Sequence, residues 1–111
     1  MRPRLQQPSE TLILHNIRQV LRWHGFYVIR IQQGLGCHKG ISDLIALKAG
    51  KVYFIEVKKP TGKLSEYQER FQAEVKERGG NYVVVRCVED VKAILTDEKE
   101  HACNTRALTD A

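Results

Sequence analysis

The sequence lacks the marks of several common protein classes. No apolar run approaches the roughly 18 residues of a membrane span, and the N-terminus has no apolar core of a signal peptide. The cysteines at positions 37, 87 and 103 have no CxxC spacing and leave one unpaired, so neither a disulfide framework nor a zinc module is expected. Neither a GxGxxG nor a P-loop is present, and no internal repeat occurs. We therefore expect a soluble protein of the reducing cytoplasm with no nucleotide cofactor and no membrane partner.

The composition is that of one globular domain with excess positive charge. Hydrophobic residues make up 42% and charged residues 28% of the 111 positions, which is ordinary for a folded domain and enough for a single core. The formal net charge of +5 favours a polyanionic partner, although many basic proteins bind none.

The apolar pattern predicts the element order α-β-β-β-α-β-α. Ser9 is a good N-cap for a helix of about Glu10 to Trp23, whose apolar residues recur at helical spacing at Leu12, Ile13, Ile17, Val20 and Leu21. The other expected elements are strands at 26–31, 44–47, 52–57 and 81–86, a helix after Ser65 that ends at Gly79-Gly80, and a short last helix at 88–95.

These elements predict an α/β fold with one mixed β-sheet flanked by helices. The strand at 81–86 returns after a helical crossover and should pair parallel to the strand at 52–57. The domain is expected over residues 9–95, with a basic N-terminal lead at 1–8 and a flexible tail at 96–111.

The segment 40–59, GISDLIALKAGKVYFIEVKK, predicts a β-hairpin that carries two acidic residues. If the turn is 49–50, Asp43 lies directly opposite Glu56, and if it is 50–51 the two carboxylates are diagonal neighbours on the same face. A three-residue loop would instead put them on opposite faces.

Two carboxylates placed together repel each other at neutral pH unless a cation lies between them. With a nearby backbone carbonyl, their hard oxygens suit Mg²⁺ or Mn²⁺, which keep several waters and can also hold a phosphate. Lys58 points the same way as Glu56 and could orient or deprotonate a water or neutralise phosphate charge. From spacing alone, the alternative is a solvated hairpin edge on which Lys58 or Lys59 simply neutralises the acids.

Asp43 followed by Glu56-Val57-Lys58 at the end of the next strand resembles the PD-(D/E)xK nuclease pattern. The fuller set of blocks is similar to the VRR-NUC branch, in which GxxD, ExK and SxxQ occur in that order. These blocks correspond here to 40–43, 56–58 and 65–68. The resemblance covers most of the chain and implies a restriction-endonuclease-like core.

The resemblance also implies the roles of individual residues. Asp43, Glu56 and the Val57 carbonyl would bind Mg²⁺ or Mn²⁺, and Lys58 would be the catalytic lysine. A glutamate on the first helix near the metal is matched by Glu10.

Gln68 belongs to the active site if the family holds. From the residues alone, Ser65-x-x-Gln68 is a capping box that accounts for both side chains without catalysis, and the helix dipole accounts for Glu10.

Basic residues around the hairpin are candidates for DNA contact, namely Lys39, Lys59 and Lys63. His38 is not expected to bind the metal, because hard oxygen sites for Mg²⁺ rarely recruit imidazole.

Stand-alone relatives of this length resemble phage and bacterial enzymes that act as dimers on four-way DNA junctions. The first hypothesis is therefore a metal-dependent endonuclease that cleaves branched DNA as a homodimer. The alternatives are a flap endonuclease or nickase without junction preference, and a DNA-binding module that does no chemistry.

Overall fold

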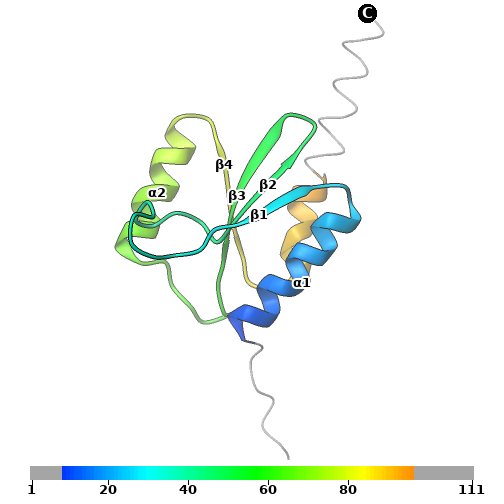
Figure 1. The fold of residues 1–111 in the computed structure, drawn as a ribbon, viewed down its shortest axis with the longest axis horizontal. Coiled ribbons are helices and arrows are strands. Elements are labelled where there is room, and N and C mark those ends of the chain that lie inside the picture. Colours follow the sequence, from blue (N-terminus) through cyan, green and yellow to red (C-terminus); the bar gives the residue numbers. More distant parts are fainter. Residues whose placement is uncertain (1–8, 97–111) are drawn as a thin grey trace, which may run out of the picture.

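The computed structural model describes residues 9–96. The predicted lead at 1–8, and the predicted tail apart from residue 96, lie outside the described residues. Within the described part the element order is a helix, three strands, a second helix, a fourth strand and a last helical segment, which confirms the predicted order (Figure 1). None of the described helices is long and apolar enough to cross a membrane.

Helix α1, Glu10–Trp23, begins where the sequence predicted, because the Ser9 hydroxyl accepts a hydrogen bond from the Leu12 amide at 3.1 Å. The residues on its buried face recur with the helical period, and they are Ile13, Leu14, Ile17 and Leu21. The prediction that Leu12 belongs to this face was wrong: Leu12 is half exposed, and Leu14 lies in the core instead.

The sheet contains β1 (Tyr27–Arg30), β2 (Leu44–Lys48), β3 (Lys51–Val57) and β4 (Asn81–Val85), in that spatial order. The pairs β1–β2 and β2–β3 are antiparallel, and β3–β4 is parallel, as predicted for a strand that returns after a helix.

The β2–β3 hairpin has the first of the two predicted registers. Leu44 pairs with Ile55 and Lys48 with Lys51, so the turn is Ala49-Gly50. Both turn residues have positive φ, 52° and 78°, as a type I′ turn requires. This register decides on which face of the sheet the acidic residues lie.

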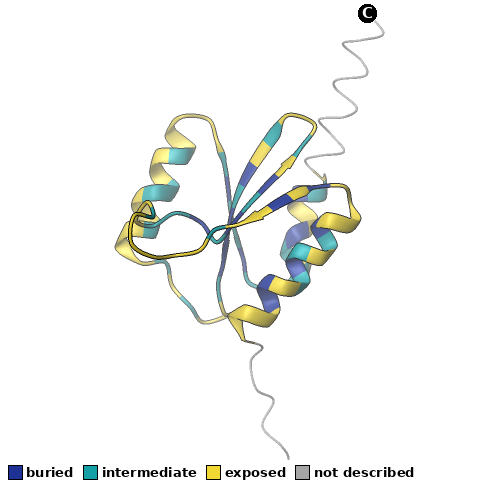
Figure 2. Ribbon diagram, in the orientation of Figure 1, coloured by how far each residue is buried: buried dark blue, intermediate teal, exposed yellow. Residues whose placement is uncertain are grey.

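The helices cover opposite sides of the sheet (Figure 1). Helix α1 packs with the short helix η1, Val88–Val91, and residues 92–96 continue as a helix. The buried positions gather on the strands and on the inner face of α1 (Figure 2).

Helix α2, Glu66–Glu77, packs on β4 and has no fully buried residue. Its Phe71 ring makes edge-to-face contacts with Phe54 and Tyr82, at centroid distances of 5.4 and 5.9 Å. Tyr67, one helical turn before Phe71 on the same side of α2, is 48% exposed. Because few apolar groups hold α2 to the sheet, its polar contacts at the N-terminal end matter for its position.

Candidate active site

Asp43 directly precedes β2 and accepts hydrogen bonds from residues at the ends of β1 and β3. Its carbonyl accepts a hydrogen bond from the Ile31 amide at 2.9 Å, just beyond β1. Its Oδ2 accepts another from the Val57 amide at 2.8 Å, at the end of β3. The register extended by one residue places Asp43 opposite Glu56, as the sequence predicted for this turn.

Glu56 is a charged residue inside the core, with a relative exposure of 2%. Its Oε1 accepts a hydrogen bond from the Gln68 side-chain amide at 2.8 Å. Its Oε2 is buried and has no hydrogen-bond partner within the described part of the chain. Burial first, and then the neighbouring Asp43 carboxyl, raise the pKa of Glu56 from its ordinary 4.5 to about 8.

The negative field of these carboxylates extends into the core. The Tyr82 hydroxyl is buried without a hydrogen-bond partner among the described residues. Its pKa is raised by burial first, and then by the charges of Glu56 and Asp43. Such a concentration of uncompensated negative charge is costly in an apolar interior unless a cation binds there.

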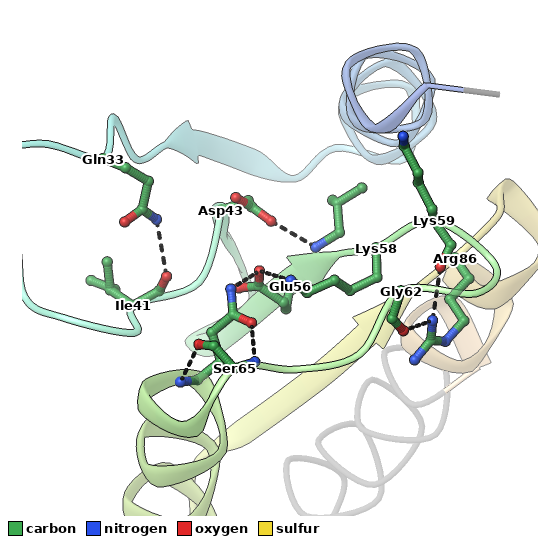
Figure 3. Close-up of polar contacts among 11 residues, drawn as sticks. Gln33, Ile41, Asp43, Glu56, Lys58, Lys59, Gly62, Ser65 and Arg86 are labelled. Atoms are coloured by element: carbon green, nitrogen blue, oxygen red, sulfur yellow. Dashed lines mark hydrogen bonds and ion pairs between the residues drawn. The ribbon is translucent and has the colours of Figure 1, made fainter.

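Lys58 supplies part of the missing positive charge. Its Nζ lies 4.0 Å from Glu56 Oε1, and its side chain is only 15% exposed (Figure 3). The loop at 59–62 folds back beside it, so that a Cβ on Gly62 would lie 3.6 Å from the Lys58 side chain.

Arg86, at the end of β4, holds this loop in place. Its Nη1 donates to the Lys59 carbonyl at 2.8 Å and to the Gly62 carbonyl at 2.5 Å (Figure 3). The guanidinium therefore holds residues 59–62, which follow the candidate catalytic Lys58, against the end of β4.

Gln68 caps α2 and also contacts the buried Glu56 carboxylate. In the capping box of α2, the side-chain Oε1 of Gln68 accepts a hydrogen bond from the Ser65 backbone amide at 2.8 Å. The Gln68 backbone amide donates one to the Ser65 hydroxyl at 3.2 Å. Its Nε2 at the same time donates to Glu56. One amide group thus caps the helix and fixes the buried carboxylate.

Gly40 explains how the loop before Asp43 can lie against this helix end. It has φ of +80°, and a Cβ there would lie 2.1 Å from the Tyr67 carbonyl oxygen. A side chain at this position would push α2 away from the sheet.

The Val57 carbonyl points toward the β2 side of β3. The Lys58 amide donates to Val85 of β4 at 3.0 Å. In a trans peptide the preceding carbonyl points the opposite way, and hence away from β4, toward the side on which Asp43 lies. Two carboxylates and this carbonyl form an all-oxygen donor set of the kind that Mg²⁺ and Mn²⁺ prefer.

The donor set fits a divalent cation that keeps part of its water. No group of three or more His, Cys, Asp or Glu side chains between residues 9 and 96 is arranged to hold a metal ion. A cation would therefore rely on Asp43, Glu56 and the Val57 carbonyl, with water filling the other positions, which is usual for Mg²⁺. The unpartnered Glu56 Oε2 is the atom that such a cation would satisfy.

Glu10 lies at the edge of this site. Its charge contributes, as the weakest cause, to the raised pKa of Glu56. With Asp43 and Val57 it lines a hollow of about 130 Å³ between α1 and the sheet. A role for Glu10 at the metal stays a prediction.

The remaining candidates lie on the surface around the site. Lys39, Lys59 and Lys63 are all exposed. The Lys39 ammonium lies 5.0 Å from the centre of the Tyr67 ring. His38 instead packs near Phe71, with ring centroids 5.8 Å apart.

Sequence reasoning missed two arginines. Arg86 ends the strand predicted at 81–86, and Arg30 lies in the strand predicted at 26–31. Neither is a predicted site residue, although Arg30 lines the same hollow as Glu10 and Asp43. A lone cation at the end of an otherwise apolar strand, as in YVIRI and YVVVR, is the signal that could have identified both.

Comparisons with known proteins identify the family of the chain. The VRR-NUC domain family matches the chain over residues 5–89, a range that includes every site residue described above. A solved structure described as a VRR_NUC domain is similar with a TM-score of 0.69 and 25% sequence identity. This similarity covers 78% of the present chain and 94% of the other. No curated protein sequence matches.

Proposed function

The chain belongs to the VRR-NUC domain family, and we propose from that premise that it is a divalent-metal-dependent endonuclease that hydrolyses phosphodiester bonds in branched DNA. The observation that carries the proposal is the buried Glu56 carboxylate beside Asp43, with one oxygen lacking any partner within the described residues. A protein that only bound phosphates would gain affinity by losing both acids.

Each side chain of the site has a distinct task in this mechanism. Asp43, Glu56 and the Val57 carbonyl would hold the cation, which when bound would acidify an attacking water and neutralise charge on the phosphate. Gln68 keeps Glu56 in one orientation through its 2.8 Å hydrogen bond. Lys58 lies close enough to Glu56 to position the water or to stabilise negative charge on the phosphoryl oxygens.

The basic surface supports DNA as the substrate. Lys39, Lys59 and Lys63 are exposed around the acidic pair, and the chain has a net charge of +5. Such residues attract the phosphate backbone without reading sequence, so cleavage should weaken steeply as salt concentration rises.

A homodimer is the proposed active form, because paired cuts at a two-fold junction need two sites. In its support, Tyr27, Leu47 and Val52 form an exposed apolar row across three strands. Leu47→Asp should yield monomer in sedimentation velocity, whereas Leu12→Asp, a control on the exposed side of α1, should not. A wild-type protein that sediments as a monomer at assay concentration would contradict this part of the proposal.

The decisive experiment compares labelled four-way junction, flap and duplex DNA, with Mg²⁺ or Mn²⁺ against EDTA. Wild type is assayed beside Asp43→Ala, Lys58→Ala and Glu77→Gln, the last a control at an exposed position on α2. The proposal expects metal-dependent paired nicks confined to the junction, absent in the first two variants and unchanged in the third. Cutting of flaps or duplex instead would discard the junction preference, and binding without cleavage would leave a DNA-binding module.

A further inference from the structure

Two hollows adjoin Asp43, and one cation lines both. The larger, about 350 Å³, extends along the segment after β1, and the smaller, about 130 Å³, extends toward the start of α1. Leu14, Arg30 and Asp43 line both of them. Arg30 is the only Lys or Arg among the described residues that line either hollow.

Arg30 is placed there by the sheet and not by a flexible loop. It pairs with Leu44, the residue after Asp43, in the β1–β2 ladder. The next residue, Ile31, donates its amide to the Asp43 carbonyl at 2.9 Å. The main chain of Arg30 therefore keeps a fixed position relative to the acidic pair.

The guanidinium of Arg30 has no partner in the described structure, although the carboxylates of Asp43 and Glu10 line the hollows. Arg70 and Arg78 are paired with Glu66 and Glu74, and Arg86 is committed to the 59–62 loop. The Arg30 side chain makes no hydrogen bond or ion pair with any residue in the range 9–96. A structural counter-ion would be expected to contact an acid, and this one does not.

An exposed guanidinium beside a carboxylate site suits a phosphodiester. Its planar set of donors can bind two oxygens of one phosphate, which a lysine ammonium cannot do in the same geometry. Phosphate that enters the hollows meets the carboxylates of Asp43 and Glu10, whereas Lys58 lies beside Glu56 and lines neither hollow. A second cation on the opposite wall of the site would lower that barrier.

We propose that Arg30 binds the scissile phosphate of the DNA across the acidic pair from Lys58, a role that rests on the proposed nuclease function. The hollows on either side of Asp43 would then receive the adjoining sugar-phosphate units of the same strand. Arg30 would be a substrate-binding catalytic residue, since its contact strengthens as negative charge grows on the phosphoryl oxygens.

The test separates phosphate binding from cleavage. Binding to a labelled four-way junction is measured by anisotropy over a salt series, in a Glu56→Gln background that does not cleave and needs no metal. Adding Arg30→Ala should reduce the slope of log K against log salt by about 0.9, the value for one phosphate contact. Arg22→Ala, which removes the same charge about 18 Å along α1 from Glu10, should leave the slope unchanged.

Cleavage is measured at saturating junction concentration in the native background. Arg30→Ala should lower kcat on the order of 10- to 100-fold, and Arg30→Lys should restore the salt slope but only part of kcat, because a lysine cannot make the paired contact. Arg30→Gln keeps part of the aliphatic side chain in the hollow that Leu14 also lines, so it controls for lost packing. Its kcat and salt slope should match those of Arg30→Ala.

The outcomes distinguish this inference from the proposed function. If wild type cleaves and Arg30→Ala matches Arg22→Ala in both salt slope and kcat, the role of Arg30 is overturned and the nuclease remains. If wild type cleaves no DNA in any metal, the nuclease proposal fails and the role of Arg30 fails with it.

Discussion

Replacing Glu56 by glutamine should abolish cleavage and at the same time stabilise the protein without metal at alkaline pH. Glutamine has nearly the same size and can keep a hydrogen bond with Gln68, but it removes the charge from a carboxyl that is 2% exposed. The cost of that charge is visible in the structure, because one Glu56 oxygen is buried without a partner in the described residues.

The pKa gives the sign and size of this effect. The pKa of Glu56 is about 8 in the fold, against an ordinary 4.5, so between these values the folded state holds a proton that the unfolded state has lost. The free energy of unfolding is therefore unaffected by this group below about pH 4.5, falls as pH rises toward 8, and levels off above it. At about 1.4 kcal/mol per tenfold change in proton affinity, the total loss is roughly 3 to 5 kcal/mol.

Urea unfolding in EDTA at pH 5 and pH 8.5 measures this difference. Wild type and Glu56→Gln should have similar stability at pH 5, and the variant should be more stable by roughly 2 to 4 kcal/mol at pH 8.5. Glu77→Gln, the same change at an exposed site, controls for net charge. Mg²⁺ at 100 times its Kd should stabilise wild type at pH 8.5 by about 2.7 kcal/mol and leave Glu56→Gln unchanged. A difference between wild type and variant that does not depend on pH would refute the reasoning.

Three further predictions concern the groups that position the site. Ser65→Ala and Gln68→Ala should each lower the free energy of unfolding by about 0.5 to 2 kcal/mol, but only Gln68→Ala, which also frees the buried carboxylate, should lower kcat in single-turnover cleavage. Gly40→Ala should reduce stability in urea by well over the roughly 1 kcal/mol expected for Gly36→Ala, since both glycines have positive φ but only the first would bring a Cβ against the backbone of α2. Arg86→Ala should increase amide hydrogen exchange in residues 59–62 and lower kcat, and unchanged exchange there would show that the guanidinium does not hold the loop.

Much of the fold could be predicted because the helix caps and turn residues indicate the same elements as the spacing of the apolar residues. Helix α1 has the predicted bounds, since Ser9 caps its start and one apolar face runs its length. The β2–β3 register is one of the two that the sequence left open, and the structure selects the one with the Ala49-Gly50 turn. Both alternatives put the acidic residues on one face, because side chains alternate along a strand. Leu12 and Leu14 were harder to assign, because both flank the buried stripe and the choice depends on how α1 is rotated against the sheet.

The site was predictable only as far as it lies on one hairpin. Asp43, Glu56 and Lys58 lie on or directly beside the two strands of one hairpin, so their proximity follows from register and alternation. Arg30 and Arg86 come from the edge strands, and their relation to the hairpin depends on strand order, which the sequence does not state. The same holds for Gly40, whose close approach to α2 becomes evident only when the loop and the helix are placed together.

Gln68 shows why a complete local explanation of a residue does not exclude a functional one. A capping box needs the side-chain oxygen to accept from Ser65, and this leaves the amide nitrogen free to donate elsewhere. A glutamate at this position would satisfy the cap equally well. It has no donor to offer when ionised, and it would add a fourth negative charge next to Glu56. The requirement for glutamine therefore comes from the buried carboxylate and not from the helix, so Gln68→Glu should preserve α2 while it weakens the hold on Glu56.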